Sequence, residues 1–236
     1  MSEFLSRSAL ILGDEGIEKL KVASVAVFGV GGVGGHAAEA LARGGVGKID
    51  LFDADVVSVS NLNRQIVALR STVGKSKAAV MRDRILDINP DCIVQAHEVF
   101  YSRENAEDFD LASYDYIIDA IDTVKSKLEL IVRAKAAGVK IISSMGAGGK
   151  LDPTAFTVAD IYDTSVCPLA KVVRGELRRL GVKNLKVVYS KEAPIKACVE
   201  GEFSRQATGS VSFVPSVVGL IMAGEVIKDI ISKKID

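Results

Sequence analysis

Hydrophobic residues follow two alternating patterns along most of the chain. Short continuous runs rich in valine and isoleucine are typical of strands buried on both faces of a parallel sheet. The segments between them repeat their apolar residues every three or four positions, the spacing of a helix with one buried face. Strands that alternate with helices predict a parallel sheet with helices on both faces. The predicted strands span residues 22–28, 48–52, 92–99, 114–119 and 140–145, and the predicted helices span 9–21, 36–43, 76–88, 103–109 and 124–137.

The pattern becomes irregular after residue 145. Later strands are predicted at 157–161 and 185–190, with a basic helix at 168–180 between them. Residues 191–212 mix glycine, serine, proline and charge, and predict a long mobile loop, because loops of that length in compact domains are usually functional or mobile.

No repeat, low-complexity tract or linker interrupts the chain. We therefore predict a single domain over residues 1–236, with its core at 22–145. The expected fold is Rossmann-like α/β, with a mostly parallel sheet, helices on both faces and an additional C-terminal strand and helix portion.

The helices at the two ends of the chain carry distinct apolar patterns. The helix at 9–21 is predicted to have a single apolar stripe that comprises Leu10, Ile11, Ile17 and Leu20. The apolar segment at 211–231 is broken by Pro215, two glycines and several charges, whereas a membrane span needs roughly 18 apolar residues with few charges. We expect a buried helix and no membrane span, with an interfacial contact as the alternative.

Composition narrows the class of protein. The 236-residue chain has 30 basic and 30 acidic side chains, and a net charge of zero argues against a nucleic-acid packaging protein but not against a local basic patch. Cys92, Cys167 and Cys198 form no Cys-x-x-Cys pair, so neither a zinc knuckle nor a redox pair is predicted. Without a signal peptide at the N-terminus, we expect a cytoplasmic protein.

A glycine-rich turn joins the first predicted strand to the helix that follows. Glycines there let the backbone approach a pyrophosphate, which lies at the helix N-terminus. Asp53 ends the next strand, about 20 positions later, where an acidic residue bonds a ribose hydroxyl. These features predict a nucleotide site and make residues 22–145 the nucleotide-binding core, with NAD as the usual occupant and a turn without a ligand as the alternative. The assigned glycines are Gly29, Gly31, Gly32 and Gly34.

Polar residues beyond Asp53 favour a triphosphate over a dinucleotide. Arg64 and Lys77 are spaced to bracket a phosphate chain that extends from the glycine turn. A triphosphate that gains charge during reaction needs such cations, whereas a dinucleotide does not. Taken singly, each cation is better explained as a solvated surface charge, and only the ordered set favours the phosphate role. The residues assigned to the nucleotide in this region are Asp55, Asn61, Arg64, Gln65 and Lys77.

Two carboxylates follow the strand at 114–119. Asp119 and Asp122 lie where the carboxyl ends of parallel strands face the ligand crevice. Mg²⁺ prefers oxygen ligands and keeps several waters, so Asp122 is the predicted magnesium ligand. A helix-cap or turn-acceptor role explains Asp119 equally well.

Four blocks of sequence, GVGGVGG, LFDADVVSVSNLNRQ, GKSK and IIDAIDT, resemble the superfamily of ubiquitin-activating enzymes and their bacterial relatives. The adenylyltransferases of thiamin and molybdopterin biosynthesis belong to it. Within it, the stretches AEALARGGVGKIDLFDAD, NLNRQIVAL, INPDC and GAGGKLDPT are most similar to the tRNA threonylcarbamoyladenosine dehydratases. The main resemblance covers roughly residues 5–160.

The resemblance implies a reaction, a set of ligands and partners. It implies that ATP is bound with Mg²⁺, and that a homodimer forms in which Arg7 reaches the other subunit's site as an arginine finger. Such a dehydratase adenylates the threonyl carboxylate of a modified adenosine in tRNA, an internal nitrogen or oxygen attacks the acyl-adenylate, and AMP leaves. Related proteins often work with a cysteine-desulfurase system. The implied ATP ligands are Gly31, Asp53, Arg64 and Lys77, with Asp122 on the metal.

The attacking group in this reaction belongs to the substrate, so the resemblance implies no cysteine nucleophile. Cys167 precedes a predicted helix, whose N-terminus can stabilise a thiolate, but a structural or incidental role is the main expectation. A dense basic run in and after this helix is usually a solvated face and is also the best candidate for tRNA phosphate contacts. The run comprises Lys171, Arg174, Arg178, Arg179, Lys183 and Lys186, opposed only by Glu176.

Three other functions are weighed against this one. An adenylyltransferase for the C-terminal glycine of a ubiquitin-like sulfur carrier is the nearest, although many such relatives carry two Cys-x-x-Cys pairs that this sequence lacks. An NAD-dependent oxidoreductase explains the glycine turn and Asp53 but leaves Arg64, Lys77 and Asp122 without a role. A non-catalytic member of the same fold is the third.

Overall fold

A seven-stranded sheet forms the centre of the structure, a computed structural model that describes residues 3–195 and 208–232. The strand order is β3-β2-β1-β4-β5-β7-β6, and every neighbouring pair is parallel except β6 with β7. This confirms the expected α/β class with a mostly parallel sheet. The strands are β1 (Ser24–Phe28), β2 (Lys48–Phe52), β3 (Ile93–His97), β4 (Tyr116–Asp119), β5 (Lys140–Ser144), β6 (Phe156–Asp160) and β7 (Lys186–Ser190).

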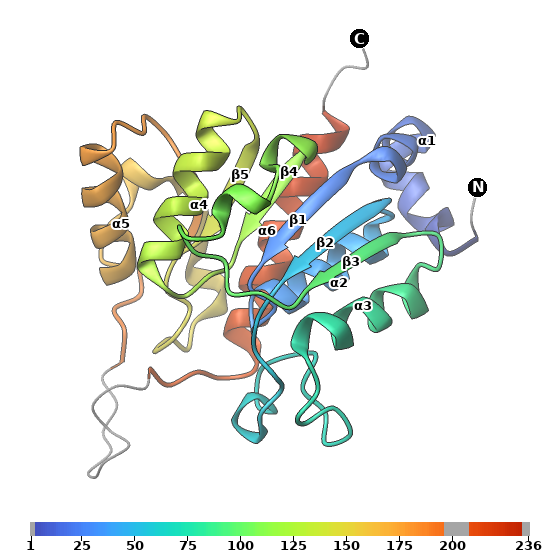
Figure 1. Cartoon of the computed structure of the whole chain (residues 1–236), viewed down its shortest axis with the longest axis horizontal. Helices are drawn as coiled ribbons and strands as arrows, with labels where there is room; N and C mark the ends of the chain where they lie inside the picture. The colour runs from blue at the N-terminus through green and yellow to red at the C-terminus, as the bar shows by residue number, and fades with distance from the viewer. Residues whose placement is uncertain (1–2, 196–207, 233–236) are drawn as a thin grey trace.

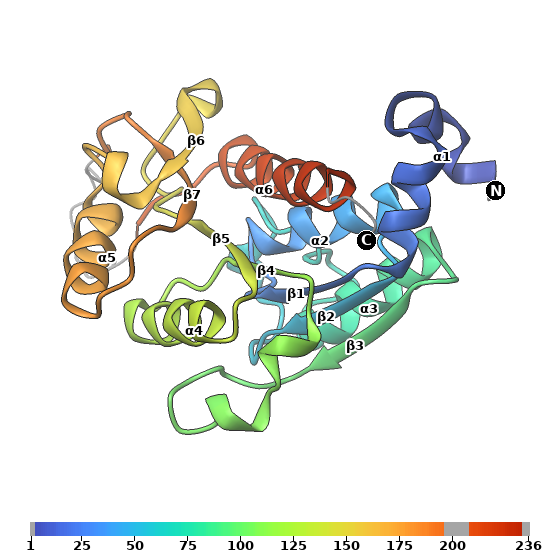
Figure 2. The ribbon, with the colours of Figure 1, turned by 90° about the horizontal axis from the view of Figure 1, so that it is seen from above.

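Helices cover both faces of this sheet (Figure 1, Figure 2). One face is covered by α2, α3 and α6, and the other by α4 and α5. The antiparallel strand β6 forms the edge beyond β7, so the extra C-terminal portion extends the sheet on the side of α5. The helices are α1 (Ser6–Val22), α2 (Gly34–Gly44), α3 (Lys77–Ile88), α4 (Val124–Ala136), α5 (Pro168–Arg179) and α6 (Phe213–Ile231).

Burial on both faces explains the continuous apolar runs in the sequence. Successive strand residues point to opposite faces, so Val25 and Val27 join one core cluster while Ala26 and Phe28 join the other. Val25, Val27 and Phe28 each contribute roughly 1.5–3 kcal/mol when fully buried, and Ala26 contributes less.

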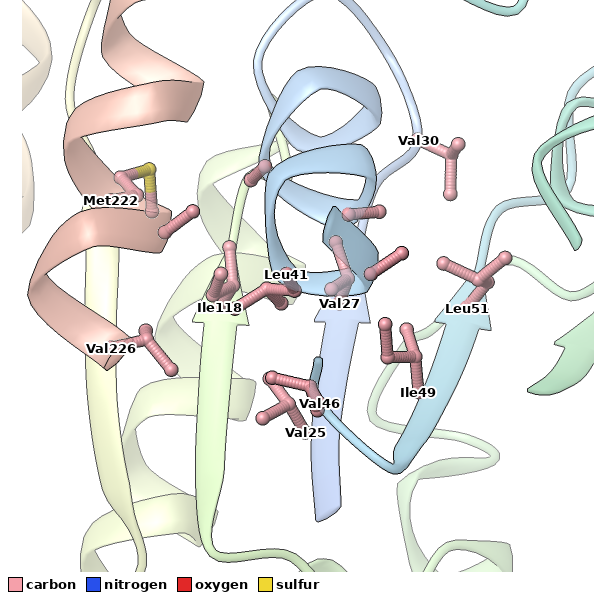
Figure 3. Close-up of a cluster of buried hydrophobic side chains, with 14 of the residues drawn as sticks. Val25, Val27, Val30, Leu41, Val46, Ile49, Leu51, Ile118, Met222 and Val226 are labelled. Atoms are coloured by element: carbon pink, nitrogen blue, oxygen red, sulfur yellow. The ribbon is translucent and has the colours of Figure 1, made fainter. Parts of the chain in front are cut away.

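The larger cluster lies between the sheet and helices α2 and α6 (Figure 3). Leu41 of α2 lies over β1 and β4, and Met222 and Val226 of α6 face the same cluster. The two helices approach closely at Gly219, where a Cβ atom would meet the carbonyl oxygen of Val33 at 2.3 Å. A side chain at Gly219 would therefore push the terminal helix off the core. No helix in the described part of the chain is long and apolar enough to cross a membrane.

Helix α1 departs from the predicted single stripe. Ile17 and Leu20 are fully buried, but Leu10 and Ile11 are 87% and 85% exposed. Gly13 has a φ of +74°, in the left-handed region that only glycine adopts readily, so the helix is interrupted there. Leu12 still packs against the core, but Leu10 and Ile11 belong to an exposed surface instead of the buried stripe of Ile17 and Leu20.

The remaining differences concern short or peripheral segments. The strand predicted at 92–99 is shorter and lies at the sheet edge, and the helix predicted at 103–109 is only the 3-10 turn Ala106–Asp108. Most of the loop predicted at 191–212 falls on residues 196–207, which lie outside the described residues, as does Cys198. The flanking residues 191–195 and 208–212 are irregular.

Candidate active site

The carboxyl ends of four parallel strands open into one cleft of about 680 Å³. This is where open α/β sheets bind their ligands, and the volume suits a nucleotide. Residues that follow β1, β2, β4 and β5 line it, together with the first residues of α3 and α5. The cleft brings together nine of the predicted nucleotide-site residues, namely Gly29, Gly31, Gly32, Asp53, Asp55, Arg64, Gln65, Lys77 and Asp122.

The glycine turn after β1 is shaped by close backbone approaches. Gly29 has a φ of +86°, and a Cβ there would lie 2.7 Å from the carbonyl oxygen of Ala120. Gly34 does not line the cleft, although a ligand role was expected. A Cβ on Gly34 would lie 1.8 Å from the carbonyl oxygen of Gly29, so this glycine lets the start of α2 pack against the turn. The N-terminus of α2 thereby faces the cleft, where backbone N–H groups attract an anion.

Asp53 cross-links the turns that follow β1 and β2. One carboxylate oxygen accepts a hydrogen bond from the backbone N–H of Val30 at 2.7 Å, and the other accepts from the N–H of Asp55 at 2.8 Å. Burial raises the pKa of Asp53 above its usual value, although these two hydrogen bonds and the nearby Lys77 act in the opposite direction. Asp53 is thus a fixed acceptor on the cleft wall.

Two cations from the connection between β2 and α3 line the cleft. Lys77 is 5% exposed, and its ammonium group lies 2.7 Å from the Asp55 carboxylate, whose side chain is largely exposed. Arg64 donates to the Ser60 carbonyl oxygen at 3.0 Å and to the Asn63 side chain at 2.9 Å. Both contacts of Arg64 fall within its own turn, so they orient the guanidinium group without burying it.

The two amide side chains assigned to the nucleotide differ in their surroundings. Asn61 does not line the cleft; its side chain accepts from the backbone N–H of Ser58 at 3.0 Å and stabilises the turn that carries Arg64. Gln65 does line the cleft, and its buried Oε1 has no hydrogen-bond partner among the described residues. A buried acceptor without a donor is costly, so this position fits a ligand that donates a hydrogen bond.

Asp119 and Asp122 point in different directions. Asp119 is fully buried and accepts hydrogen bonds from Lys127 at 2.8 Å, Ser143 at 2.6 Å and the backbone N–H of Ile121 at 3.1 Å. The expectation that it faces the crevice is therefore wrong, because its charge is compensated by Lys127 below the cleft floor. The turn-acceptor role holds, and it fixes the backbone that leads to Asp122.

Asp122 is exposed and lines the cleft. Within the described ranges, no group of three acidic, histidine or cysteine side chains is arranged to hold a metal ion. One carboxylate fits Mg²⁺, which is commonly bound by one or two carboxylates together with substrate phosphates and water. The residues thus suit an ion that arrives with a triphosphate.

Several cleft residues were missed by the sequence reasoning. Lys127 pairs with Asp119 below the floor of the cleft. The sequence feature that could have revealed it is a lysine on the apolar face of the helix predicted at 124–137. Tyr101 lines the cleft with a buried hydroxyl that has no partner in the described part of the chain, and burial raises its pKa to about 12. Lys150, which is 3% exposed, lines the end of the cleft near β5. Cys167, which is 2% exposed, lines the cleft at the start of α5, the position expected from the sequence.

Three of the predicted tRNA-binding residues are exposed on α5. They are Lys171, Arg178, which lies 5.2 Å from the ring centroid of Tyr162, and Arg179, which pairs with Glu176. Two members of the basic run have internal partners instead. Arg174 donates to Thr164 at 2.7 and 2.6 Å, and Lys186 pairs with Glu225 and Asp229 of α6.

Arg7 does not line the cleft of its own chain. It is exposed on α1, the helix drawn at the right edge of Figure 1. A role for this side chain in catalysis therefore requires a second chain.

The sequence pattern of the ThiF family matches residues 5–236. The tRNA threonylcarbamoyladenosine dehydratase of Bacillus subtilis strain 168 is 48% identical over 238 residues, covering 96% of this chain and 94% of that protein. The protein of the same name from Escherichia coli strain K12 is 37% identical over 248 residues, covering 96% and 92%. A crystal structure of the E. coli tRNA N6-threonylcarbamoyladenosine dehydratase in complex with ATP is similar with a TM-score of 0.90 and 36% identity, covering 98% of this chain and 94% of that one. This chain therefore belongs to the ThiF family.

Proposed function

We propose that the chain is an ATP-dependent tRNA threonylcarbamoyladenosine dehydratase. The observation that carries the proposal is the convergence of Asp53, Arg64, Lys77 and Asp122 on one cleft of a ThiF-family fold. The relatives named for this activity align over nearly the whole chain.

Each of these side chains has a role that its surroundings support. Asp53, held by two backbone N–H groups, accepts from a ribose hydroxyl of ATP. The glycine turn and the N-terminus of α2 bind phosphate oxygens, and Arg64 and Lys77 neutralise the charge of the triphosphate. Asp122 is the residue that would hold Mg²⁺, which supplies further neutralisation of the phosphates when bound.

The reaction has two steps on one substrate. A threonyl carboxylate oxygen attacks the α-phosphorus of ATP, the bond to the bridging oxygen breaks, and pyrophosphate leaves. A nitrogen or oxygen of the same substrate then attacks the activated carbonyl carbon, and AMP leaves as the ring closes. No sulfur is transferred, so the cysteine-desulfurase partner implied by the resemblance has no step in this scheme.

We infer a homodimer from the apolar surface around α1. Leu10 and Ile11 are largely exposed, and Leu220 of α6 is 52% exposed. Ile11 and Leu220 also line a groove of about 530 Å³ with Ile227. Exposed apolar surface of this kind favours a partner, and a second copy is the occupant that also supplies Arg7 to a cleft.

Mass analysis of tRNA nucleosides tests the proposed function. Incubation of modified tRNA with the protein and ATP should convert threonylcarbamoyladenosine to a product lighter by one water, with release of AMP and pyrophosphate. ATP–pyrophosphate exchange that depends on a sulfur-carrier protein, and not on modified tRNA, would instead support the carrier adenylyltransferase. Tight binding of NAD without affinity for ATP and Mg²⁺ would support the oxidoreductase.

A further inference from the structure

A second group of cleft residues lies beyond the nucleotide site, at the carboxyl end of β5. In the sheet β5 is three positions from β2, which precedes Asp53, so the two strand ends are roughly 14 Å apart at about 4.8 Å per strand. The nucleotide proposal gives this group no role. Its members include Gly146, Ala147, Lys150, Leu169, Pro194 and Thr208.

Lys150 is the cation of this group. Its side chain is 3% exposed and yet lines the cleft. The ammonium group has three N–H donors, and one donates to the backbone carbonyl oxygen of Glu192. Among the described residues it has no ion-pair partner, because the Glu192 carboxylate accepts instead from the backbone N–H groups of Leu151 and Asp152, at 2.9 and 3.1 Å.

A buried cation with unused donors is stabilised by a bound anion. Burying a charge without an opposite charge is costly, and the apolar neighbours Ala147, Leu169 and Pro194 strengthen any charge interaction there. The end of the cleft near β5 is therefore an anion site in a mostly apolar wall.

The backbone around Lys150 is held in place before any ligand binds. The N–H of Gly149 donates to the Gly209 carbonyl oxygen at 2.7 Å, and the Gly149 carbonyl oxygen accepts from Ile195 at 2.7 Å. A Cβ on Gly148 would lie 2.6 Å from the Thr208 side chain, so the loop packs closely against its neighbours. Lys150 consequently projects from a fixed loop.

We propose that Lys150 binds the carboxylate of the threonyl group and holds it for attack on ATP, an assignment that rests on the proposed function. In adenylation the attacking oxygen and the leaving pyrophosphate lie on opposite sides of the α-phosphorus. Lys77 lies beside Asp55 on the β2 side of the cleft and Arg64 lies beside Gly32 at the start of α2, and the two cations hold the phosphate chain. The carboxylate then approaches from the β5 side, where Lys150 is the buried cation.

Lys150→Met tests this assignment in the full-length protein, with Lys191→Met as a control at a neighbouring exposed lysine. The KM for tRNA bearing threonylcarbamoyladenosine should rise about 10- to 100-fold in Lys150→Met, the loss expected for a hydrogen bond to a charged group. The Kd values for ATP and for tRNA lacking the threonylcarbamoyl group should stay within about twofold. Lys150→Arg should recover part of the loss.

Three other results would contradict the assignment of Lys150 to the threonyl carboxylate. A parallel loss of ATP affinity would place Lys150 on the triphosphate, and a parallel loss of affinity for unmodified tRNA would place it on a backbone phosphate. An unchanged KM would leave Lys150 with a structural role only. If Lys150→Met fails to fold, Lys150→Gln, whose amide still donates to Glu192, takes its place in the same comparison. A wild-type protein inactive on modified tRNA would overturn the proposed function as well.

Discussion

At the residue scale, Arg64 and Asp122 are side chains of the cleft that contribute little to packing. Among the described residues, Arg64 hydrogen-bonds only within its own turn, and Asp122 is exposed. Arg64→Ala and Asp122→Ala should each lower kcat/KM for tRNA dehydration by about 100-fold or more, because charge on the phosphates is no longer neutralised. The melting temperature should stay within about 3 °C of wild type.

Arg82→Ala is the matched control for these variants. Arg82 is a half-exposed arginine that pairs with Asp83 outside the cleft, so its loss should leave turnover unchanged. Wild-type rates in both Arg64→Ala and Asp122→Ala would refute the assignment of the site.

A second prediction concerns Cys167, the buried thiol at the start of α5. The substrate supplies its own attacking group in the proposed reaction, so Cys167→Ser should keep kcat within about threefold of wild type. Turnover of modified tRNA and trapping of any thioester with hydroxylamine measure this. A loss as large as that of Arg64→Ala, or a trapped thioester, would assign the thiol to the reaction.

Much of the site could be predicted because its residues follow strand ends at characteristic spacings. The glycine turn, Asp53 and Asp122 are of this kind. Contacts that depend on packing could not be predicted in the same way. Asp119 is the last residue of β4, directly before the turn that lines the cleft. Only the position of Lys127 on α4 reveals that the Asp119 carboxylate is paired below the cleft floor. The sequence shows a lysine at position 150, within GAGGKLDPT, but it does not show that this side chain is buried.

At the element scale, the exposed face of α5 is the proposed contact for tRNA phosphates. Changing Lys171 and Arg178 together to Glu should weaken tRNA binding, and the slope of log Kd against log salt concentration should fall by about 2. ATP affinity should not change, because neither residue lines the cleft. Lys21→Glu on α1 is the control, since α1 lies far from α5 (Figure 1). Unchanged binding and slope in the α5 variant would identify this face as a solvated helix surface.

Helix α6 is attached to the sheet by a group of polar side chains. Asp229 accepts from Tyr116 and from Lys186, both at 2.7 Å, and Glu225 also pairs with Lys186. Burial alone would raise the pKa of Asp229, but the hydrogen bonds from Lys186 and Tyr116 outweigh it, so the pKa lies below its usual 3.8. This interaction adds stability above that pH and is lost as the pH falls through the lower pKa of the folded state.

Asp229→Asn should therefore lower the free energy of unfolding at pH 7 by about 1 kcal/mol, a modest figure because solvent partly screens the ion pair. The difference from wild type should shrink as the pH falls below about 3.8. Urea unfolding at neutral and acidic pH measures both values. An equal difference at all pH values would show that the lost stability is not electrostatic.

The elements themselves differ in how far sequence could locate them. Strands β1, β2, β4 and β5 are buried on both faces, so their apolar runs marked them clearly. Helix α1 was placed correctly but given the wrong exposed face, because a single left-handed glycine redirects its first turns. The 3-10 turn Ala106–Asp108 lacks the periodicity that would separate it from a short helix.

At the scale of the whole molecule, one chain leaves two features incomplete. Leu10 and Ile11 are largely exposed, and Arg7 lies outside its own cleft. A two-fold symmetric dimer accounts for both features. In such a dimer the apolar surface of each chain is buried against the other chain, and each chain places its Arg7 at the cleft of the other. Leu10→Glu with Ile11→Glu should then convert the protein from dimer to monomer in sedimentation experiments.

Complementation between two inactive variants tests whether Arg7 acts across that dimer. Arg7→Ala and Arg64→Ala should each be inactive alone. In a mixed dimer, the cleft of the Arg7→Ala chain keeps its own Arg64 and receives an intact Arg7 from the other subunit, so it is complete, while the second cleft lacks both. After unfolding and refolding of an equal mixture, half of the dimers should be mixed, and the activity should return to about a quarter of wild type. A mixture that stays inactive, although mixed dimers are detected by mass, would place Arg7 outside the reaction or within its own chain's site.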